Sequence, residues 1–182
     1  MEQVSTPDSK HERWQEKYRQ LVTEYEAMGL YVAGVIDGGS AITVVVGKDS
    51  KARLGYHITP TISLRRRNPA ILQVIDEWAT EHGIRGSIIE KNDSLEWKLQ
   101  SRDDVREFLE LLEPYLIVHD NTAQLILNEV LPRLDEGTHR TKDGFLETIE
   151  YADMVREATS GSTPKYNAEY FEELWSEELS SG

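Results

Sequence analysis

Hydrogen-bonding and cationic side chains alternate with apolar ones between Lys51 and Arg65. The apolar residues are Leu54, Tyr56, Ile58, Ile62 and Leu64. The polar positions are occupied by Lys51, Arg53, His57, Thr59, Thr61, Ser63 and Arg65. Because neighbouring side chains of a strand point to opposite faces of a sheet, this spacing predicts one long strand with a buried and a polar face. The polar face has no acidic residue, which favours binding of a polyanion over simple exposure to solvent.

The distribution of charge supports this interpretation, although the total charge does not. The 182 residues include 33 acids and 20 lysines or arginines, and the formal net charge is -13. That balance alone argues against a nucleic-acid partner. Residues 47–67, however, carry a net charge of +5, which leaves -18 on the remainder. A basic island on an acidic body is typical of a polyanion-binding face in a halophilic protein, where acidic surface maintains solubility. The alternative is an ordinary surface hairpin with basic flanks.

Composition limits the remaining classes of protein. The chain has no cysteine, so neither a disulfide framework nor a thiolate metal site is available. No apolar run approaches the length of a membrane span, and the polar first residues do not resemble a signal peptide. We therefore expect a cytoplasmic protein with one main domain and no membrane partner.

A second candidate site lies at the end of the apolar stretch of residues 31–40. Gly34 and Gly38 are four residues apart, so they share one face of a helix, and small residues there allow another helix to approach closely. The stretch stops at Asp37, which is followed by Gly38 and Gly39. The alternative is an ordinary core helix with a glycine stop.

The predicted elements that would position these residues form an α+β domain. We expect a helix over 8–28 that ends or kinks at Gly29, and a short helix over 32–36. Strands are predicted over 41–46, 51–65, 87–91 and 95–99, and further helices over 69–83, 102–112, 121–134, 144–159 and 166–179. Two antiparallel hairpins would form one four-stranded sheet with helices on one face. Glu96 and Lys98 alternate with apolar neighbours and would extend the polar face.

Two separate segments resemble signatures of one family. Residues 32–40, VAGVIDGGS, are similar to the LAGLIDADG motif that names a family of homing endonucleases. Residues 112–125, LEPYLIVHDNTAQL, resemble that family's downstream signature L-x-P-[FY]-L-x-x-K-x-x-Q-A-x-L. The predicted order of elements from 30 to 158 is similar to the family's αββαββα core, with a saddle-shaped sheet. The domain would span 30–160, between a helical extension over 1–29 and an acidic helical tail over 161–182.

The resemblance implies a protein that binds and cuts double-stranded DNA. A single motif implies a homodimer on a roughly palindromic site, with Mg²⁺ at the foot of each motif helix. The implied dimer contacts are Val32, Ala33, Gly34, Val35 and Gly38. The implied DNA contacts are Lys48, Lys51, Arg53, His57, Thr59, Thr61, Ser63, Arg65, Arg67, Glu96 and Lys98.

The implied catalytic residues are Asp37, Gly39, Arg66 and His119, and two of them depart from the family pattern. The second motif acid, which holds the metal, falls on Gly39 or is deleted, so Asp37 is the one remaining candidate ligand. His119 replaces the signature lysine, and Arg66 falls near the position that organises the attacking water. These changes favour an alternative: a catalytically inactive DNA-binding regulator or RNA-splicing helper on the same scaffold. A third hypothesis is an interaction module that uses the acidic tail.

Overall fold

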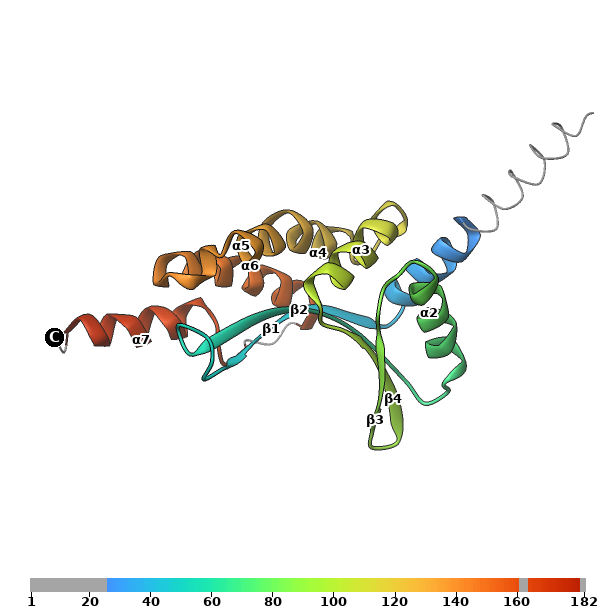
Figure 1. The fold of residues 1–182 in the computed structure, drawn as a ribbon, viewed down its shortest axis with the longest axis horizontal. Coiled ribbons are helices and arrows are strands. Elements are labelled where there is room, and N and C mark those ends of the chain that lie inside the picture. The colour runs from blue at the N-terminus through green and yellow to red at the C-terminus, as the bar shows by residue number, and fades with distance from the viewer. Residues whose placement is uncertain (1–25, 161–163, 181–182) are drawn as a thin grey trace, which may run out of the picture.

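A computed structural model describes residues 26–160 and 164–180 of the chain (Figure 1). The predicted helix over 8–28 falls almost wholly outside these residues. The described part opens with a helix over 26–37. The strands are β1 Ser40–Lys48, β2 Tyr56–Arg66, β3 Ser87–Lys91 and β4 Ser94–Leu99. The longer helices are α2 Ala70–Glu81, α3 Arg102–Leu112, α6 Lys142–Ser160 and α7 Ala168–Ser180. Shorter helical segments are η1 Glu113–Tyr115, α4 Asp120–Leu125, η2 Ile126–Val130, α5 Leu131–Glu136 and η3 Thr138–Arg140.

The four strands form one antiparallel sheet in the order β1-β2-β4-β3. Ser40 pairs with Leu64 across β1 and β2, and Ile62 pairs with Leu99 across β2 and β4. Helices α3 to α6 cover one face of β1 and β2, and the β3–β4 hairpin curves away from them, which leaves the opposite face open (Figure 1). The predicted α+β architecture with a four-stranded antiparallel sheet is therefore confirmed.

The buried face of the sheet is the one that the alternation predicts. Ile62, Leu64 and Trp97 are fully buried, and Trp97 packs against Phe108 of α3. The indole N–H of Trp97 donates to the Asp76 carboxylate at 2.8 Å, so the polar atom of this large core residue is satisfied. The core lies between the sheet and the helices, which fixes the other face of the sheet as the exposed one.

Strand β2 begins five residues later than the alternation predicts. Residues 50–55 form a turn, in which the Asp49 side chain accepts a hydrogen bond from the Lys51 backbone N–H at 2.9 Å. Gly55 adopts a left-handed conformation, with φ +77°, as the chain enters β2. Lys51 and Arg53 therefore lie at the hairpin tip and not on the strand, because local turn chemistry overrides the apparent alternation.

The helix over 26–37 passes through Gly29 without a break, so the predicted helix end at this residue is wrong. Gly29 is buried, and a Cβ atom there would lie 3.4 Å from the Tyr115 ring. The glycine therefore does not end the helix, and a side chain at this position would begin in ordinary van der Waals contact with Tyr115 of η1.

Two other predicted helix ends are confirmed in part. Gly83 has φ +81°, and Ile84 N–H donates to Ala79 O at 2.9 Å, which closes α2 as expected for a glycine C-cap. Ser101 caps α3 by accepting from the Asp104 N–H at 3.5 Å. Asp104 accepts from the backbone N–H of Arg85 and not from that of Ser101, so the reciprocal half of a capping box is not formed.

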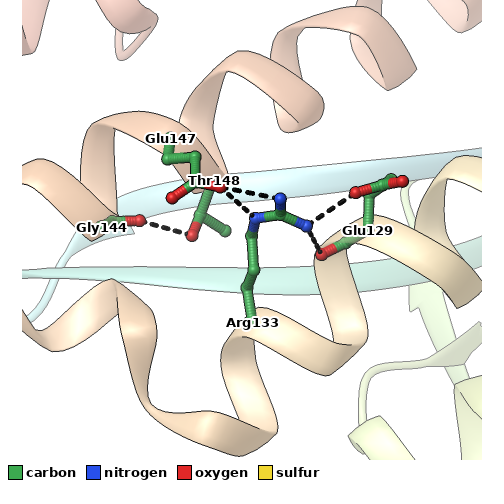
Figure 2. A network of polar contacts seen from close by, with 5 residues as sticks. All are labelled: Glu129, Arg133, Gly144, Glu147 and Thr148. Carbon is green, nitrogen blue, oxygen red and sulfur yellow. Dashed lines mark hydrogen bonds and ion pairs between the residues drawn. The ribbon is translucent and has the colours of Figure 1, made fainter.

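The predicted helix over 121–134 is split by a π-helical segment, η2, between α4 and α5. Arg133 ties this region to α6 (Figure 2). Its guanidinium donates to the Glu129 carboxylate at 2.7 Å and to the Glu147 carboxylate at 2.8 Å. The hydrogen bond to Glu147 raises the pKa of Arg133, an effect opposed by burial and reinforced by Glu129. The network joins three helical segments on the side away from the open sheet face.

The predicted tail helix, α7, is docked onto the domain. Phe171 is fully buried, and its ring packs edge-on against Tyr56 and beside Phe145. Arg156, which is buried, donates to the Tyr166 carbonyl at 2.9 Å and forms an ion pair with Asp153. Within the described ranges, none of the helices combines the length and apolar character that a membrane span requires.

Candidate nucleic-acid interface

The open face of the sheet carries most of the predicted polar residues. Cross-strand pairs share a face, and Ser63 is paired with Lys98 and Arg65 with Glu96. Arg65 Nη2 lies 3.5 Å from Glu96 Oε1, and the Arg65 side chain is 59% exposed. Glu96 is the one carboxylate among the strand residues of this face, all of which the structure describes. The face therefore has few charges that would repel a polyanion.

Two of the predicted DNA contacts are not available on the open face: one lies on the other side of the sheet, and one is covered by its neighbours. Lys48 is paired with Tyr56, which places it on the side of the sheet that carries the core residues. Thr61 belongs to the open face, but it is only 3% exposed, and its hydroxyl donates to Thr59 O at 3.2 Å. Alternation alone does not report how closely the neighbouring side chains cover a position. Thr59 and Ser63 remain half-buried on the face, and Arg67 is exposed just beyond β2.

The His57 ring lies over a glycine on the neighbouring strand. His57 is paired with Gly47, and a Cβ atom at Gly47 would lie 2.7 Å from His57 Cε1. Contacts between real Cβ atoms and other heavy atoms are almost never that short, so any larger residue at this position would displace the ring. Gly47 thus gives His57 its position on the open face.

A cavity of about 360 Å³ opens beside the β1–β2 hairpin tip. Its cationic and histidine lining residues are Lys51, Arg53, His57, Arg102, His139 and Arg140. Burial lowers the pKa of His139, and the positive charges of Arg102 and Arg140 lower it further. The sequence prediction missed Arg102, His139 and Arg140, because only the tertiary fold brings η3 and the start of α3 to the hairpin.

The four predicted catalytic positions come together at the end of the 26–37 helix. Asp37 Oδ2 accepts from the Ile117 N–H at 2.7 Å, and Asp37 Oδ1 accepts from the His119 N–H at 3.0 Å. Burial alone would raise the pKa of Asp37, but the backbone donors of residues 117–119 and the charge of His119 outweigh it and lower the pKa. Both carboxylate oxygens are thus engaged in holding the 116–119 loop.

Arg66 and Gly39 form the other half of this centre. Arg66 is paired with Leu95, on the opposite side of the sheet from Arg65, and its guanidinium donates to Gly39 O at 3.1 Å. His119 is buried and reaches Asp37 through its backbone N–H. Among the described residues, no group of three or more His, Cys, Asp and Glu side chains is arranged to hold a metal ion. Of the four predicted catalytic residues, Asp37 is the one that carries a carboxylate.

The exposed face of the 26–37 helix differs from the predicted dimer contacts. Val32 and Ala33 are buried in the core of the chain, so their side chains are not available to a second copy. Gly34 and Gly38 are exposed, and Val35 is half-buried. The loop held by Asp37 carries two neighbouring apolar residues, Ile117 and Val118, which are 86% and 68% exposed. The helical spacing correctly placed Gly34 and Gly38 on one face of the helix. It did not show that Val32 and Ala33 pack against the core.

Known structures provide an independent comparison. No protein-family model and no curated protein matches the sequence. The homing endonuclease I-CvuI, in complex with DNA and 2 mM Mg, has a TM-score of 0.75 and 20% identity over 85% of this chain and 96% of that chain. An archaeal intron-encoded homing endonuclease complexed with DNA, I-Vdi141I, has a TM-score of 0.72 and 18% identity over 84% of this chain and 96% of that one.

A larger protein matches over part of its length. The LAGLIDADG meganuclease I-CpaMI, bound to uncleaved DNA, has a TM-score of 0.60 and 16% identity over 76% of this chain and 52% of that chain. The strand order, the placement of the helices and the similarity to these structures all indicate the same fold. The chain has the fold of the LAGLIDADG homing endonucleases.

Proposed function

We propose that this chain is a LAGLIDADG-type protein that binds double-stranded DNA through the open face of its sheet. The observation that carries the proposal is the pairing of Ser63 with Lys98 and Arg65 with Glu96 on a face that no helix of the described residues covers. Hydroxyl, ammonium and guanidinium groups can bind base edges and phosphates. I-CvuI and I-Vdi141I, which share the fold, are in complex with DNA.

The cationic cavity at the hairpin tip extends this surface. Arg53 and Arg140 are exposed, and neither makes an ion pair within the described residues. Unpaired cations at the end of a binding face are suited to backbone phosphates, which carry charge but no sequence information. We therefore assign base recognition to the open face and phosphate binding to Lys51, Arg53 and Arg140.

Two copies of the chain would form the binding unit, as a homodimer on a roughly palindromic site. Gly34 leaves open space where a side chain would stand, and exposed Leu30 and Tyr31 belong to the same helix. A second helix can approach such a surface closely, and a twofold axis would join identical patches. The match of this chain to about half of I-CpaMI supports an assembly of two such units.

Metal-dependent cleavage is the second candidate function. I-CvuI and I-Vdi141I are homing endonucleases, which favours it, although the DNA in the I-CvuI complex with 2 mM Mg is not cleaved. In this chain both oxygens of Asp37 are engaged by backbone donors, and Gly39 has no side chain. We therefore infer a binding protein without magnesium-dependent cleavage, which is compatible with a regulator. An RNA-splicing helper would use the same surface on RNA.

Selection from a pool of random DNA duplexes tests the proposal. We expect enrichment of a roughly palindromic site, bound by two chains as measured by analytical ultracentrifugation. Arg65→Ala should weaken binding by about 1–3 kcal/mol. Arg106→Ala is the matched control, because Arg106 pairs with Asp135 in the helical layer and its loss changes the charge equally.

Three outcomes would contradict parts of the proposal. Absence of any enriched duplex would remove DNA binding, and tighter binding of structured RNA would favour the splicing role. Cleavage of the selected duplex with Mg²⁺ or Mn²⁺ would restore the nuclease assignment.

A further inference from the structure

The guanidinium of Arg66 occupies the space that a side chain at position 39 would need. A Cβ atom on Gly39 would lie 2.7 Å from Arg66 Nη2, 3.2 Å from Nη1 and 3.3 Å from Cζ. These separations are shorter than ordinary van der Waals contact. Gly39 and the Arg66 guanidinium are therefore complementary in shape, and a carboxylate cannot stand at position 39 while Arg66 keeps its place.

Arg66 is held there by carbonyl oxygens and not by a carboxylate. Its Nη1 donates to Gly39 O at 3.1 Å and to Arg65 O at 2.8 Å. Within the part of the chain that the structure describes, Arg66 forms no ion pair, and its Nε and Nη2 atoms donate no hydrogen bond. One edge of the guanidinium fixes its position, while the Nε–Nη2 edge keeps two parallel donors and an uncompensated positive charge.

Asp37 does not neutralise this charge at the same centre. Its two oxygens accept from the Ile117 and His119 N–H groups, and its lowered pKa keeps it ionised in that role. The end of the helix thus presents a cation where the resemblance implies a metal held by acids. This donor set is poorly suited to a divalent cation, because Asp37 supplies the one carboxylate of the four predicted catalytic residues and Gly39 supplies no side-chain oxygen.

We propose that Arg66 takes the place of the metal centre and binds a phosphate diester of duplex DNA, so that DNA recognition by this chain is independent of divalent metal. The inference rests on the proposed DNA-binding function. A guanidinium edge with two parallel donors matches two phosphate oxygens, which makes the contact bidentate. No bond is made or broken in this role.

The proposal makes a specific statement about restoring the missing acid. In Gly39→Asp the new carboxylate would meet the guanidinium, and the flexible end of Arg66 would move and pair with it. An ion pair would form in place of a metal site. Removing the guanidinium as well, in Gly39→Asp with Arg66→Gln, leaves the carboxylate unpaired and able to bind a cation.

The test compares wild type, Arg66→Gln, Arg66→Lys, Gly39→Asp and the Gly39→Asp/Arg66→Gln double variant. DNA affinity is measured by fluorescence anisotropy on the selected duplex, in EDTA and in Mg²⁺ at matched ionic strength. Binding of Mn²⁺ alone is measured by electron paramagnetic resonance. Circular dichroism melting establishes that each variant is folded, and Arg65→Ala reports on the sheet face separately.

We expect wild-type affinity to be the same in EDTA and in Mg²⁺, and Arg66→Gln to weaken it about tenfold. The affinity of Arg66→Lys should lie between those of wild type and Arg66→Gln, because lysine keeps the charge and loses the paired donors. Wild type and Gly39→Asp should bind no Mn²⁺ above background, whereas the double variant should bind it.

Three outcomes would each overturn the proposal. They are loss of wild-type DNA binding in EDTA, an unchanged DNA affinity in Arg66→Gln, and Mn²⁺ binding by the Gly39→Asp single variant. If Arg65→Ala weakens DNA binding and Arg66→Gln does not, the Arg66 role fails while the DNA-binding function stands. If wild type binds no duplex at all, the proposed function fails, and this role with it.

Discussion

Asp37 Oδ1 accepts a hydrogen bond of 3.0 Å from the backbone N–H of His119, 82 residues further along the chain. The other oxygen, Oδ2, accepts from Ile117. These two bonds join the two segments that resemble family signatures. The acid at the helix end therefore has a structural role that needs neither metal nor DNA.

Replacing Asp37 should destabilise the protein. In Asp37→Asn one oxygen acceptor is exchanged for an NH₂ donor, so a backbone N–H of the loop loses its partner. We expect the free energy of unfolding in urea to fall by about 1–3 kcal/mol. Asp49→Asn is a suitable comparison, because Asp49 also accepts a backbone hydrogen bond but lies in an exposed turn. Equal stability losses in the two variants would contradict the role assigned to Asp37.

The same carboxylate should make stability depend on pH. Its pKa in the folded protein lies below the ordinary value of 3.8, so the ionised form is favoured by folding. The contribution is fully present above the ordinary value and is lost as the pH falls through the folded-state value. Urea unfolding at pH 2 to 6 should show this loss in wild type. The Asp37→Asn variant should lose less stability over that range, and parallel curves would contradict the assignment.

Removing the acid from the open sheet face should strengthen DNA binding. Glu96 lies 3.5 Å from Arg65 and is the carboxylate of that face, so Glu96→Gln frees Arg65 and removes a repulsive charge. We expect an affinity gain of about two- to fivefold in low salt, with a steeper salt dependence. Glu107→Gln, on the exposed side of α3, has the same charge change and serves as the control. Equal effects of the two would show that only total charge matters.

A large side chain at Gly34 should prevent dimer formation and leave the fold intact. Apart from the helix's own nearby backbone, no heavy atom lies within 4 Å of a Cβ at this position, so the side chain of Gly34→Leu starts in open space. We expect sedimentation as a monomer, with an unchanged circular dichroism spectrum. Thr80→Leu places the same side chain at an exposed position of α2 and should not change the assembly. A Gly34→Leu dimer would place the twofold contact elsewhere.

Docking of α7 should depend on Arg156. Arg156→Met removes the donor to Tyr166 O and leaves Asp153, which also accepts from the Ala168 N–H at 2.8 Å, without its ion-pair partner. We expect a stability loss of about 3 kcal/mol. Hydrogen exchange should accelerate in peptides from Ala168–Ser180 more than in those from the sheet. Uniform acceleration in both would contradict a local docking role.

Much of the fold could be predicted because local patterns agree with the tertiary structure. The alternation of Ile58, Ile62 and Leu64 identified the buried face of β2, and Gly83 marked the end of α2. The hairpin tip was predicted incorrectly because Lys51 and Arg53 continue the alternation by chance while Asp49 forms a turn. Residue type and spacing do not reveal such a competition between local interactions.

The sequence identified several residues of the candidate site, but not how they are arranged. Asp37 and His119 were both identified, yet their hydrogen bond depends on how the 116–119 loop folds back. The position of Arg66 over Gly39 depends on a contact between residues 27 apart in the sequence, which the alternation of side chains along β2 does not reveal. The cations of Arg102 and Arg140 reach the hairpin only through packing of the helical layer.

The fit between Arg66 and Gly39 has a consequence for how this protein can change over generations. An acid at position 39 gains nothing while the arginine remains, and loss of the arginine alone removes a positive charge without creating a metal ligand. Neither single substitution improves either chemistry, so a return to a metal-binding centre requires both together. The pairing of Arg66 with Gly39 therefore makes it difficult for single substitutions to restore a metal-binding centre.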